Sequence, residues 1–399
     1  MARIYLDHAA STAVDPRVLE QMLPYFGTSF GNASSLHELG REGREAVDSA
    51  RARIAASIGA SRPEEVVFTS GGTESNNLAL KGVALANRRK GRHIITSRIE
   101  HDSVLNSAAW LEGLGFAVTY LDVDEHGSVR PEALAAAIRP DTTLVSIMHA
   151  NNEIGTIEPV RELAQVCAER GVPFHTDACQ SFGKLPVDVA HDPLGLVTLN
   201  AHKVYGPKGV GALYVRESLR LEPCQHGGGH EFGLRSSTEN VPGIVGFAAA
   251  AELACAERER EMPRMTRLRD RIFDRVLGDV PGAYVNGHRT RRLATNVNLG
   301  FAGLEGEAIT LQLRLDERGI AVATGSACSS HQESAPSHVL LAIGRDPIQA
   351  RGAVRVTLGR YNTEEEIDRF LEELRTALAS LRPISSVGVA APSALEARG

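Results

Sequence analysis

The chain has 399 residues, 43% of them hydrophobic, which is enough for a large core and too long for one small domain. A net charge of −6 and a pI near 6.2 argue against a nucleic-acid-binding protein, which is usually basic. No apolar run approaches the length of a membrane span, and Asp7 stands where a signal peptide would be apolar, so we expect a cytoplasmic protein.

Between about residue 65 and residue 215, short β-branched runs alternate with helical patterns. This alternation predicts an α/β fold with a mostly parallel, doubly wound sheet of seven strands. Ligands of such sheets bind beyond the carboxyl ends of the strands. Strands are predicted at 66–69, 94–97, 118–121, 144–148, 174–177, 197–199 and 211–215, and helices between most of them, including 131–138 and 160–170.

After Pro242 the pattern changes to a long helix, which predicts a second, smaller α+β domain. Thr363 and Glu366 form the capping box of its last helix. The predicted elements are a helix over 244–261 that continues through 265–277, strands at 296–299, 320–323 and 353–358, and helices at 307–318 and 363–381. We expect a large domain of 15–261, a small domain of 1–14 and 262–384, and a disordered tail of 385–399, which is rich in Ala, Ser, Gly and Pro.

The first polar motif, TSGGTESNN at 69–77, leaves a predicted strand and opens a predicted helix. Its two glycines let the backbone approach an anion, and the free N–H groups of a helix start favour phosphate. It is not a P-loop, because no Gly-Lys-Ser/Thr follows. An ordinary strand–helix turn is the alternative.

His101, Asn152 and Gln180 follow the ends of other predicted strands. An imidazole there can stack on a cofactor ring and move protons, although a lone histidine is more often structural. The amides suit hydrogen bonds to a ring hydroxyl or a carboxylate, although asparagine is also common in turns.

Lys203 is the one lysine of five that directly follows a predicted strand, in a turn with His202, and Asp177 ends an earlier strand. Pyridoxal phosphate needs a lysine that forms an imine and an acid that keeps the pyridine nitrogen protonated. A surface lysine and a helix-capping aspartate are the alternatives. Together the two residues predict a pyridoxal phosphate site.

Five cysteines lack CxxC or CxxH spacing, which disfavours a disulfide framework and a zinc site. Cys328 lies among small polar residues near His331 and His338, so it is a candidate nucleophile, or a tolerated loop cysteine. Arg355 projects from an apolar strand, where it could hold a substrate carboxylate or form a structural salt bridge.

Taken together, these segments resemble the cysteine desulfurases of the NifS/IscS type, a branch of the class-V aminotransferases within the fold-type I pyridoxal phosphate-dependent transferases. The resemblance runs from Ile4 to about Arg382 and covers the motifs TSGGTESNNLA, EHDSV, SIMHANNEIG, HTDACQSFGKLPVD, AHKVYGPKGVGALYVR, HGGGHEFGLRSST, TGSAC and VRVTLGR. It implies removal of sulfur from L-cysteine, giving L-alanine and a persulfide for an acceptor protein.

The resemblance also implies a catalytic role for Lys203, His101 and Cys328, and a cofactor-binding role for Asp177. Lys203 would bind the cofactor covalently, and Asp177 would pair with its pyridine nitrogen. His101 would stack on the ring and take part in catalysis. Cys328 would accept the sulfur, and it would transiently ligate an iron–sulfur cluster if the acceptor is a cluster scaffold.

The remaining implied roles concern the phosphate and the substrate. Gly72, Thr73 and His202 would hold the phosphate, together with Asn200, which stands where the family usually has serine. Thr238 would reach the phosphate of a neighbouring subunit, which implies a homodimer.

Gln180 and Asn152 would bond to the ring oxygen and the substrate, and Arg355 with Asn152 would clamp the substrate carboxylate. The acceptor would be an iron–sulfur scaffold, a tRNA-thiolation protein or a DNA-phosphorothioation protein. A selenocysteine lyase or related class-V aminotransferase, with Cys328 incidental, is the alternative function, and a non-catalytic scaffold is a third.

Overall fold

The alternating strands and helices of residues 65–215 form one seven-stranded sheet, which confirms the predicted fold class. The structure is a computed structural model that describes residues 3–324 and 336–385. The strand order is β2-β8-β7-β6-β5-β3-β4, and β8 runs antiparallel to its two neighbours while the other pairs are parallel. The strands are β2 (Val66–Thr69), β3 (His93–Ser97), β4 (Ala117–Leu121), β5 (Thr142–Ser146), β6 (Phe174–Asp177), β7 (Leu196–Asn200) and β8 (Gly211–Val215).

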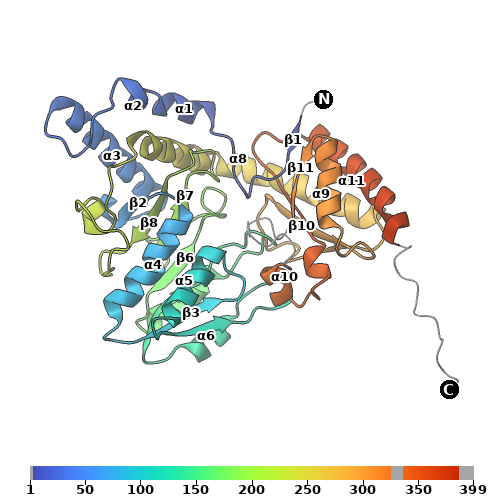
Figure 1. Cartoon of the computed structure of the whole chain (residues 1–399), viewed down its shortest axis with the longest axis horizontal. Coiled ribbons are helices and arrows are strands. Elements are labelled where there is room, and N and C mark those ends of the chain that lie inside the picture. The colour runs from blue at the N-terminus through green and yellow to red at the C-terminus, as the bar shows by residue number, and fades with distance from the viewer. Residues whose placement is uncertain (1–2, 325–335, 386–399) are drawn as a thin grey trace, which may run out of the picture.

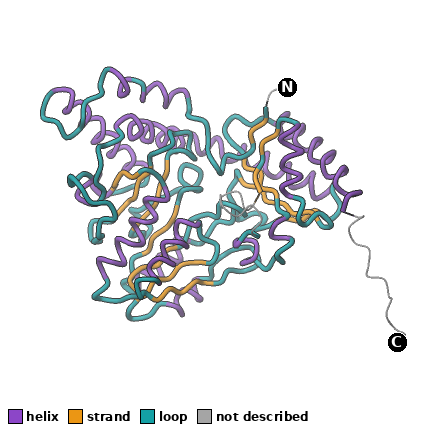
Figure 2. Tube along the Cα trace, viewed as in Figure 1, coloured by secondary structure: helices purple, strands orange, loops and turns teal. Residues whose placement is uncertain are grey.

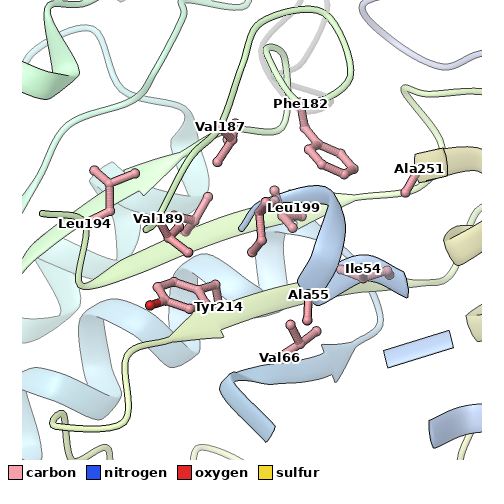
Figure 3. Packing of buried hydrophobic residues seen from close by; sticks show 14 of the residues in the cluster. Ile54, Ala55, Val66, Phe182, Val187, Val189, Leu194, Leu199, Tyr214 and Ala251 are labelled. Atoms are coloured by element: carbon pink, nitrogen blue, oxygen red, sulfur yellow. The ribbon is translucent and has the colours of Figure 1, made fainter. Parts of the chain in front are cut away.

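Helices cover both faces of this sheet (Figure 1; Figure 2). Each face of the sheet packs against its own cluster of buried apolar residues. Val67 and Leu213 belong to the cluster on one face. Their neighbours Val66 and Tyr214 belong to the cluster on the other face, which also contains Ile54 (Figure 3). Burial on both faces explains why these strands are almost continuously apolar. One face carries α4 (Gly72–Asn87) and α5 (Asp102–Glu112), and the other carries α3 (Glu38–Ser57), α6 (Pro131–Ala137), α7 (Val160–Glu169) and the first part of α8 (Val241–Asp279).

Helix α8 joins this core to a second one. It has 39 residues and continues past Pro263. The Asn240 side chain accepts a hydrogen bond from the Gly243 N–H group at 3.1 Å and caps the first turn, which places the start of the helix before the predicted residue 244. Its second half contributes Met265 and Ile272 to the second cluster of buried residues.

The second core surrounds a four-stranded antiparallel sheet of order β12-β13-β10-β9. Thr363 and Glu366 exchange hydrogen bonds of 3.3 Å, which confirms the capping box of α11. The elements are β9 (Ala283–Val285), β10 (Asn296–Phe301), α9 (Ala308–Glu317), β12 (Ala323–Thr324), β13 (Val354–Thr357) and α11 (Glu364–Ser385). The short strand β1 (Ile4–Tyr5) pairs with β11 (Ile320–Ala321), so the start of the chain belongs to this core.

One predicted element is wrong, because the strand expected over 320–323 is two strands. The backbone changes partner at Val322: β11 pairs with β1, and β12 pairs with β13. The domain boundaries stay a prediction. The predicted tail lies outside the described residues except for Ser385, the last residue of α11.

The remaining short elements are α1 (Pro16–Met22), α2 (Pro24–Gly27) and α10 (His338–Ala342), with 3-10 turns at Pro63–Glu65, Glu231–Gly233 and Gln349–Arg351. Within residues 3–324 and 336–385, no helix has the length and hydropathy of a membrane span.

Candidate active site

A cavity of about 250 Å³ lies beyond the carboxyl ends of the parallel strands, where such a sheet binds ligands. Most of the predicted site residues share its wall, although they come from distant parts of the chain. These are Gly72, Thr73, His101, Asn152, Asp177, Gln180, Asn200, His202 and Lys203. The wall also contains residues that the sequence did not single out, namely Ala9, Ala10, Asn76, Ser103, Met148, Ala150 and Cys179.

Asp177 ends β6 and is held as a carboxylate. Its Oδ2 accepts a hydrogen bond from Asn76 Nδ2 at 2.7 Å, and its Oδ1 accepts one from the Cys179 N–H group at 2.8 Å. Burial alone would raise the pKa of Asp177, but the neighbouring His101 and these two hydrogen bonds outweigh it and lower the pKa below its usual value. A lasting negative charge at this point suits a protonated ring nitrogen.

Asn76 is the main residue that the sequence reasoning missed. Its Nδ2 also donates to Ser103 Oγ at 2.8 Å, so it joins the Asp177 carboxylate to the start of α5. It lies one turn into α4 and is 1% exposed, between residues that pack in the core. A polar residue on the apolar side of a helix is the signal that would have found it.

His101 caps α5 and presents a neutral ring to the cavity. Its Nδ1 accepts a hydrogen bond from the Ser103 N–H group at 3.1 Å, which leaves Nε2 to carry the ring proton. Burial lowers the pKa of His101, although the Asp177 carboxylate opposes the effect. The imidazole is therefore available for stacking and for donating one hydrogen bond.

Lys203 lines the cavity from the turn after β7. Another lysine, Lys184, lies close by in an adjoining cavity of about 40 Å³ that Lys203 also lines. The Lys184 amine donates to the Gln180 carbonyl oxygen at 3.0 Å, and burial lowers its pKa to about 7. Of the five lysines, Lys203 alone lines the larger cavity, and its role as the amine for a carbonyl ligand stays a prediction.

The start of α4, which also lines the cavity, lies against Cys179 and Asn200. A side chain at Gly72 would come within 2.5 Å of Cys179 Sγ, so glycine is required for this close approach. The free N–H groups of this helix start favour an anion. Burial lowers the pKa of His202 to about 4, with help from the charge of Lys203, so His202 is neutral and can donate.

The residues present fit pyridoxal phosphate. The Oδ1 atoms of Asn76, Asn152 and Asn200 are buried and have no partner among the described residues, although each amide belongs to a cavity-lining side chain. Buried polar atoms normally have partners, and orphans gathered around one cavity point to a polar ligand. A helix start, an amine and a buried carboxylate complete the set that this cofactor requires.

Arg355 is placed behind the cavity wall. It is 2% exposed, and its Nη1 donates to the Asn152 carbonyl oxygen at 3.0 Å. Its Nη2 pairs with Asp7 Oδ1 at 3.0 Å, while its Nε is buried without a partner among the described residues. The structure thus contains a salt bridge of Arg355, which was the alternative to its binding of a substrate carboxylate. The same side chain also contacts Asn152, which lines the cavity. Its carboxylate-binding role stays a prediction.

Two predicted residues are not in this wall. Thr238 is exposed, on the segment that precedes α8, and its contact with a neighbouring subunit stays a prediction. Cys328 lies outside the described residues, as does His331. The four other cysteines, Cys167, Cys179, Cys224 and Cys255, are free.

Glu100, next to His101, is a buried acid for which we predict a pH effect on stability. Its Oε1 accepts hydrogen bonds from Ser97 Oγ at 2.6 Å and from the Met148 N–H group at 3.0 Å, and its Oε2 has no partner in the part of the chain that the structure describes. Burial raises its pKa from 4.5 to about 8. The folded protein therefore holds a proton that the unfolded chain releases, and the stability from this proton is full below pH 4.5 and is lost as the pH rises through 8.

The Glu100→Gln variant keeps the shape of the Glu100 side chain but cannot ionise. It should match the wild type near pH 5 and exceed it at pH 9 by on the order of 2–4 kcal/mol. Thermal unfolding at several pH values measures this, with the exposed Glu125→Gln as the control. A difference that does not change with pH would contradict the assignment.

The aminotransferase class-V family model matches residues 4–370. The cysteine desulfurase IscS of Dictyoglomus turgidum is 50% identical over 382 residues, which is 96% of this chain and 96% of that protein. A solved NifS-like protein is 40% identical with a TM-score of 0.89, over 95% of this chain and 100% of its own. A structure described as SspA in complex with cysteine is 40% identical with a TM-score of 0.79, over 90% of this chain and 100% of its own. The chain therefore belongs to the class-V aminotransferase family and, within it, to the cysteine desulfurases of the NifS/IscS type.

Proposed function

We propose that the chain uses pyridoxal phosphate to remove sulfur from L-cysteine, and that the products are L-alanine and a persulfide on Cys328. The observation that carries this proposal is that Lys203 and Asp177 line the same cavity as the start of α4 and a neutral histidine. Near-full-length identity to cysteine desulfurases supports the choice of reaction.

Pyridoxal phosphate, when bound, supplies an aldehyde that captures amines and a ring that accepts the electron pair left on a carbon that loses its proton. Lys203 would hold the aldehyde end, and Asp177 would keep the ring nitrogen protonated. The N–H groups of Gly72 and Thr73 would hold the phosphate, with His202 and Asn200 as further donors.

The substrate amine would displace the Lys203 amine, which then takes the Cα proton of cysteine on its Nζ atom. Asn152 and Gln180 would orient the substrate and the ring oxygen, and His101 would stack on the ring and carry a proton on Nε2. Arg355 would meet the substrate carboxylate from behind Asn152. The cysteine in the SspA structure supports this substrate class.

The sulfur step needs one thiolate. Cys328 attacks the substrate sulfur, so that an S–S bond forms and the carbon–sulfur bond breaks. The electron pair of the broken bond remains on the substrate carbon. This carbon then takes a proton and becomes the methyl group of alanine. The two thiols thus give one persulfide and one alanine, so the persulfide sulfur is oxidised and the carbon is reduced by the same two electrons.

Disposal of the sulfur completes the cycle. An acceptor protein would collect it from Cys328, for iron–sulfur cluster assembly or for thio-modification of tRNA or DNA. Two copies of the chain would form a homodimer in the cytoplasm, in which the exposed Thr238 completes the phosphate site of the other copy.

One assay tests this function. The protein, loaded with pyridoxal phosphate and given L-cysteine and dithiothreitol, should form alanine and sulfide in equal amounts, with none formed when the cofactor is left out. Faster turnover of L-selenocysteine than of cysteine by more than about 100-fold would favour a selenocysteine lyase instead. A protein that binds the cofactor and releases no alanine would contradict a catalytic role.

A further inference from the structure

Two polar residues follow Cys328 in the chain at the start of α10: Ser337 caps this helix and His338 is its first residue. The Ser337 hydroxyl donates to Glu153 Oε2 at 2.6 Å and accepts from the Leu340 N–H group at 3.1 Å. Ser337 is 4% exposed and Glu153 is 5% exposed, so this contact is shielded from water. Burial raises the pKa of Glu153, and the Ser337 hydrogen bond opposes that effect because it favours the carboxylate form.

His338 makes the second contact of this pair. Its Nε2 donates to the Glu100 carbonyl oxygen at 2.9 Å. The backbone N–H group of Ser337 also donates to the Ala350 carbonyl oxygen at 3.2 Å. Ser337 and His338 therefore tie the start of α10 to two turns at the end of the large sheet.

Apolar packing supports the same attachment. Val339 and Leu340 of α10 share a small buried cluster with Ile99, Met148 and Ile154, which lie in or beside those turns. The cluster is separate from the two main cores and also contains Ala350 and Ala353, so α10 is packed between the segments that follow β3 and β5 and its own later neighbours in the chain.

Both acceptors adjoin residues of the cavity. Glu100 directly precedes His101, and Glu153 directly follows Asn152. The other end of the Cys328 segment is also fixed near the site, because Thr324 of β12 pairs with Val354, the neighbour of Arg355. Nine positions separate Cys328 from Ser337, and a chain of that length can span up to about 30 Å. An unattached end would leave the thiol a large volume to sample.

We propose that Ser337 and His338 are positioning residues, which fix the end of the Cys328 segment beside His101 and Asn152 and so raise the frequency with which the Cys328 thiolate meets the substrate sulfur. This inference rests on the proposed desulfurase function. Its physical basis is that holding a nucleophile near its target replaces a wide search by a local one.

The test measures the first turnover, which needs Cys328 and no acceptor. Holoenzyme is mixed with excess cysteine without dithiothreitol, and the rate of the first alanine per subunit is followed. Ser337→Ala should lower this rate by about 10- to 100-fold, while the cysteine concentration for half-maximal rate and the visible absorbance of the bound cofactor change less than twofold. Ser337→Thr, which keeps the hydroxyl, should restore most of the rate.

His338→Ala provides a second, independent variant, and it should slow the same step. Ser57→Ala is the matched control, because Ser57 Oγ also donates a hydrogen bond, to the Ile54 carbonyl oxygen at 2.7 Å, and Ser57 does not line the cavity. An unchanged rate in both Ser337→Ala and His338→Ala, or a rate that falls only in proportion to bound cofactor, would overturn the inference. If the wild type itself forms no alanine, the proposed function fails rather than the role of Ser337.

Discussion

Lys203→Ala should lose the covalent link to pyridoxal phosphate and lower alanine formation by at least about 10³-fold. Lys203 lines the cavity at the end of β7 and supplies both the anchor for the aldehyde and the base for the Cα proton. Lys184 should not replace it, because its amine is hydrogen-bonded to the Gln180 carbonyl oxygen in the adjoining cavity. Visible absorbance and peptide mass after borohydride reduction measure the link, and an alanine assay measures the rate.

Lys208→Ala is the matched control for this experiment. Lys208 lies in the same turn and is exposed, so the variant should keep its absorbance and its rate within about twofold. A Lys203→Ala protein that still gives a borohydride-stable adduct, on Lys184 or elsewhere, would show that the wrong amine has been chosen.

Cys328→Ala should stop alanine formation almost completely, by at least about 10³-fold, and keep the cofactor. The reason is that no other sulfur nucleophile is expected to serve. Burial and the charge of Asp177 raise the pKa of Cys179 well above its usual value, so the one described thiol that lines the cavity stays protonated. Protonated thiols are poor nucleophiles. The alanine assay and the cofactor spectrum, recorded before and after cysteine is added, separate the two effects.

Cys224→Ala is the control here, because Cys224 is a free, exposed cysteine of the same chain. It should keep full activity. Mass spectrometry of the wild type after one turnover should find the additional sulfur on the peptide of Cys328. Persulfide on Cys179 or Cys224 instead, or normal turnover in Cys328→Ala, would reject the nucleophile assignment and favour a transaminase-like reaction.

Most of the large sheet could be predicted from the sequence, because strands buried on both faces are short, apolar and separated by helices. The strand at 320–323 could not, because its backbone changes partner at Val322 without any change in residue type. Partner choice depends on segments far away in sequence, here Ile4–Tyr5 and Val354–Thr357, and periodicity carries no information about it.

The cavity could be predicted in large part because its polar side chains stand at strand ends, where a parallel sheet brings them to one edge. Asn76 was missed because only the fold brings it to Asp177, 101 positions away. Ser103 is close to His101 in sequence, but its contact with Asn76 also depends on the fold. Glu153 and its contact with Ser337 were missed for the same reason, since 184 positions separate the two residues.

The pairing of β1 with β11 has a consequence for protein synthesis. Ala9 and Ala10, made first, form part of the cavity wall, and the Ala9 carbonyl oxygen accepts a hydrogen bond from Gln180 Nε2 at 3.1 Å. The strand that holds this segment in place, and the Arg355 that pairs with Asp7 across 348 positions, are synthesised much later than this segment. This part of the pocket wall therefore cannot be fixed until the second core has been synthesised, however early the large sheet folds.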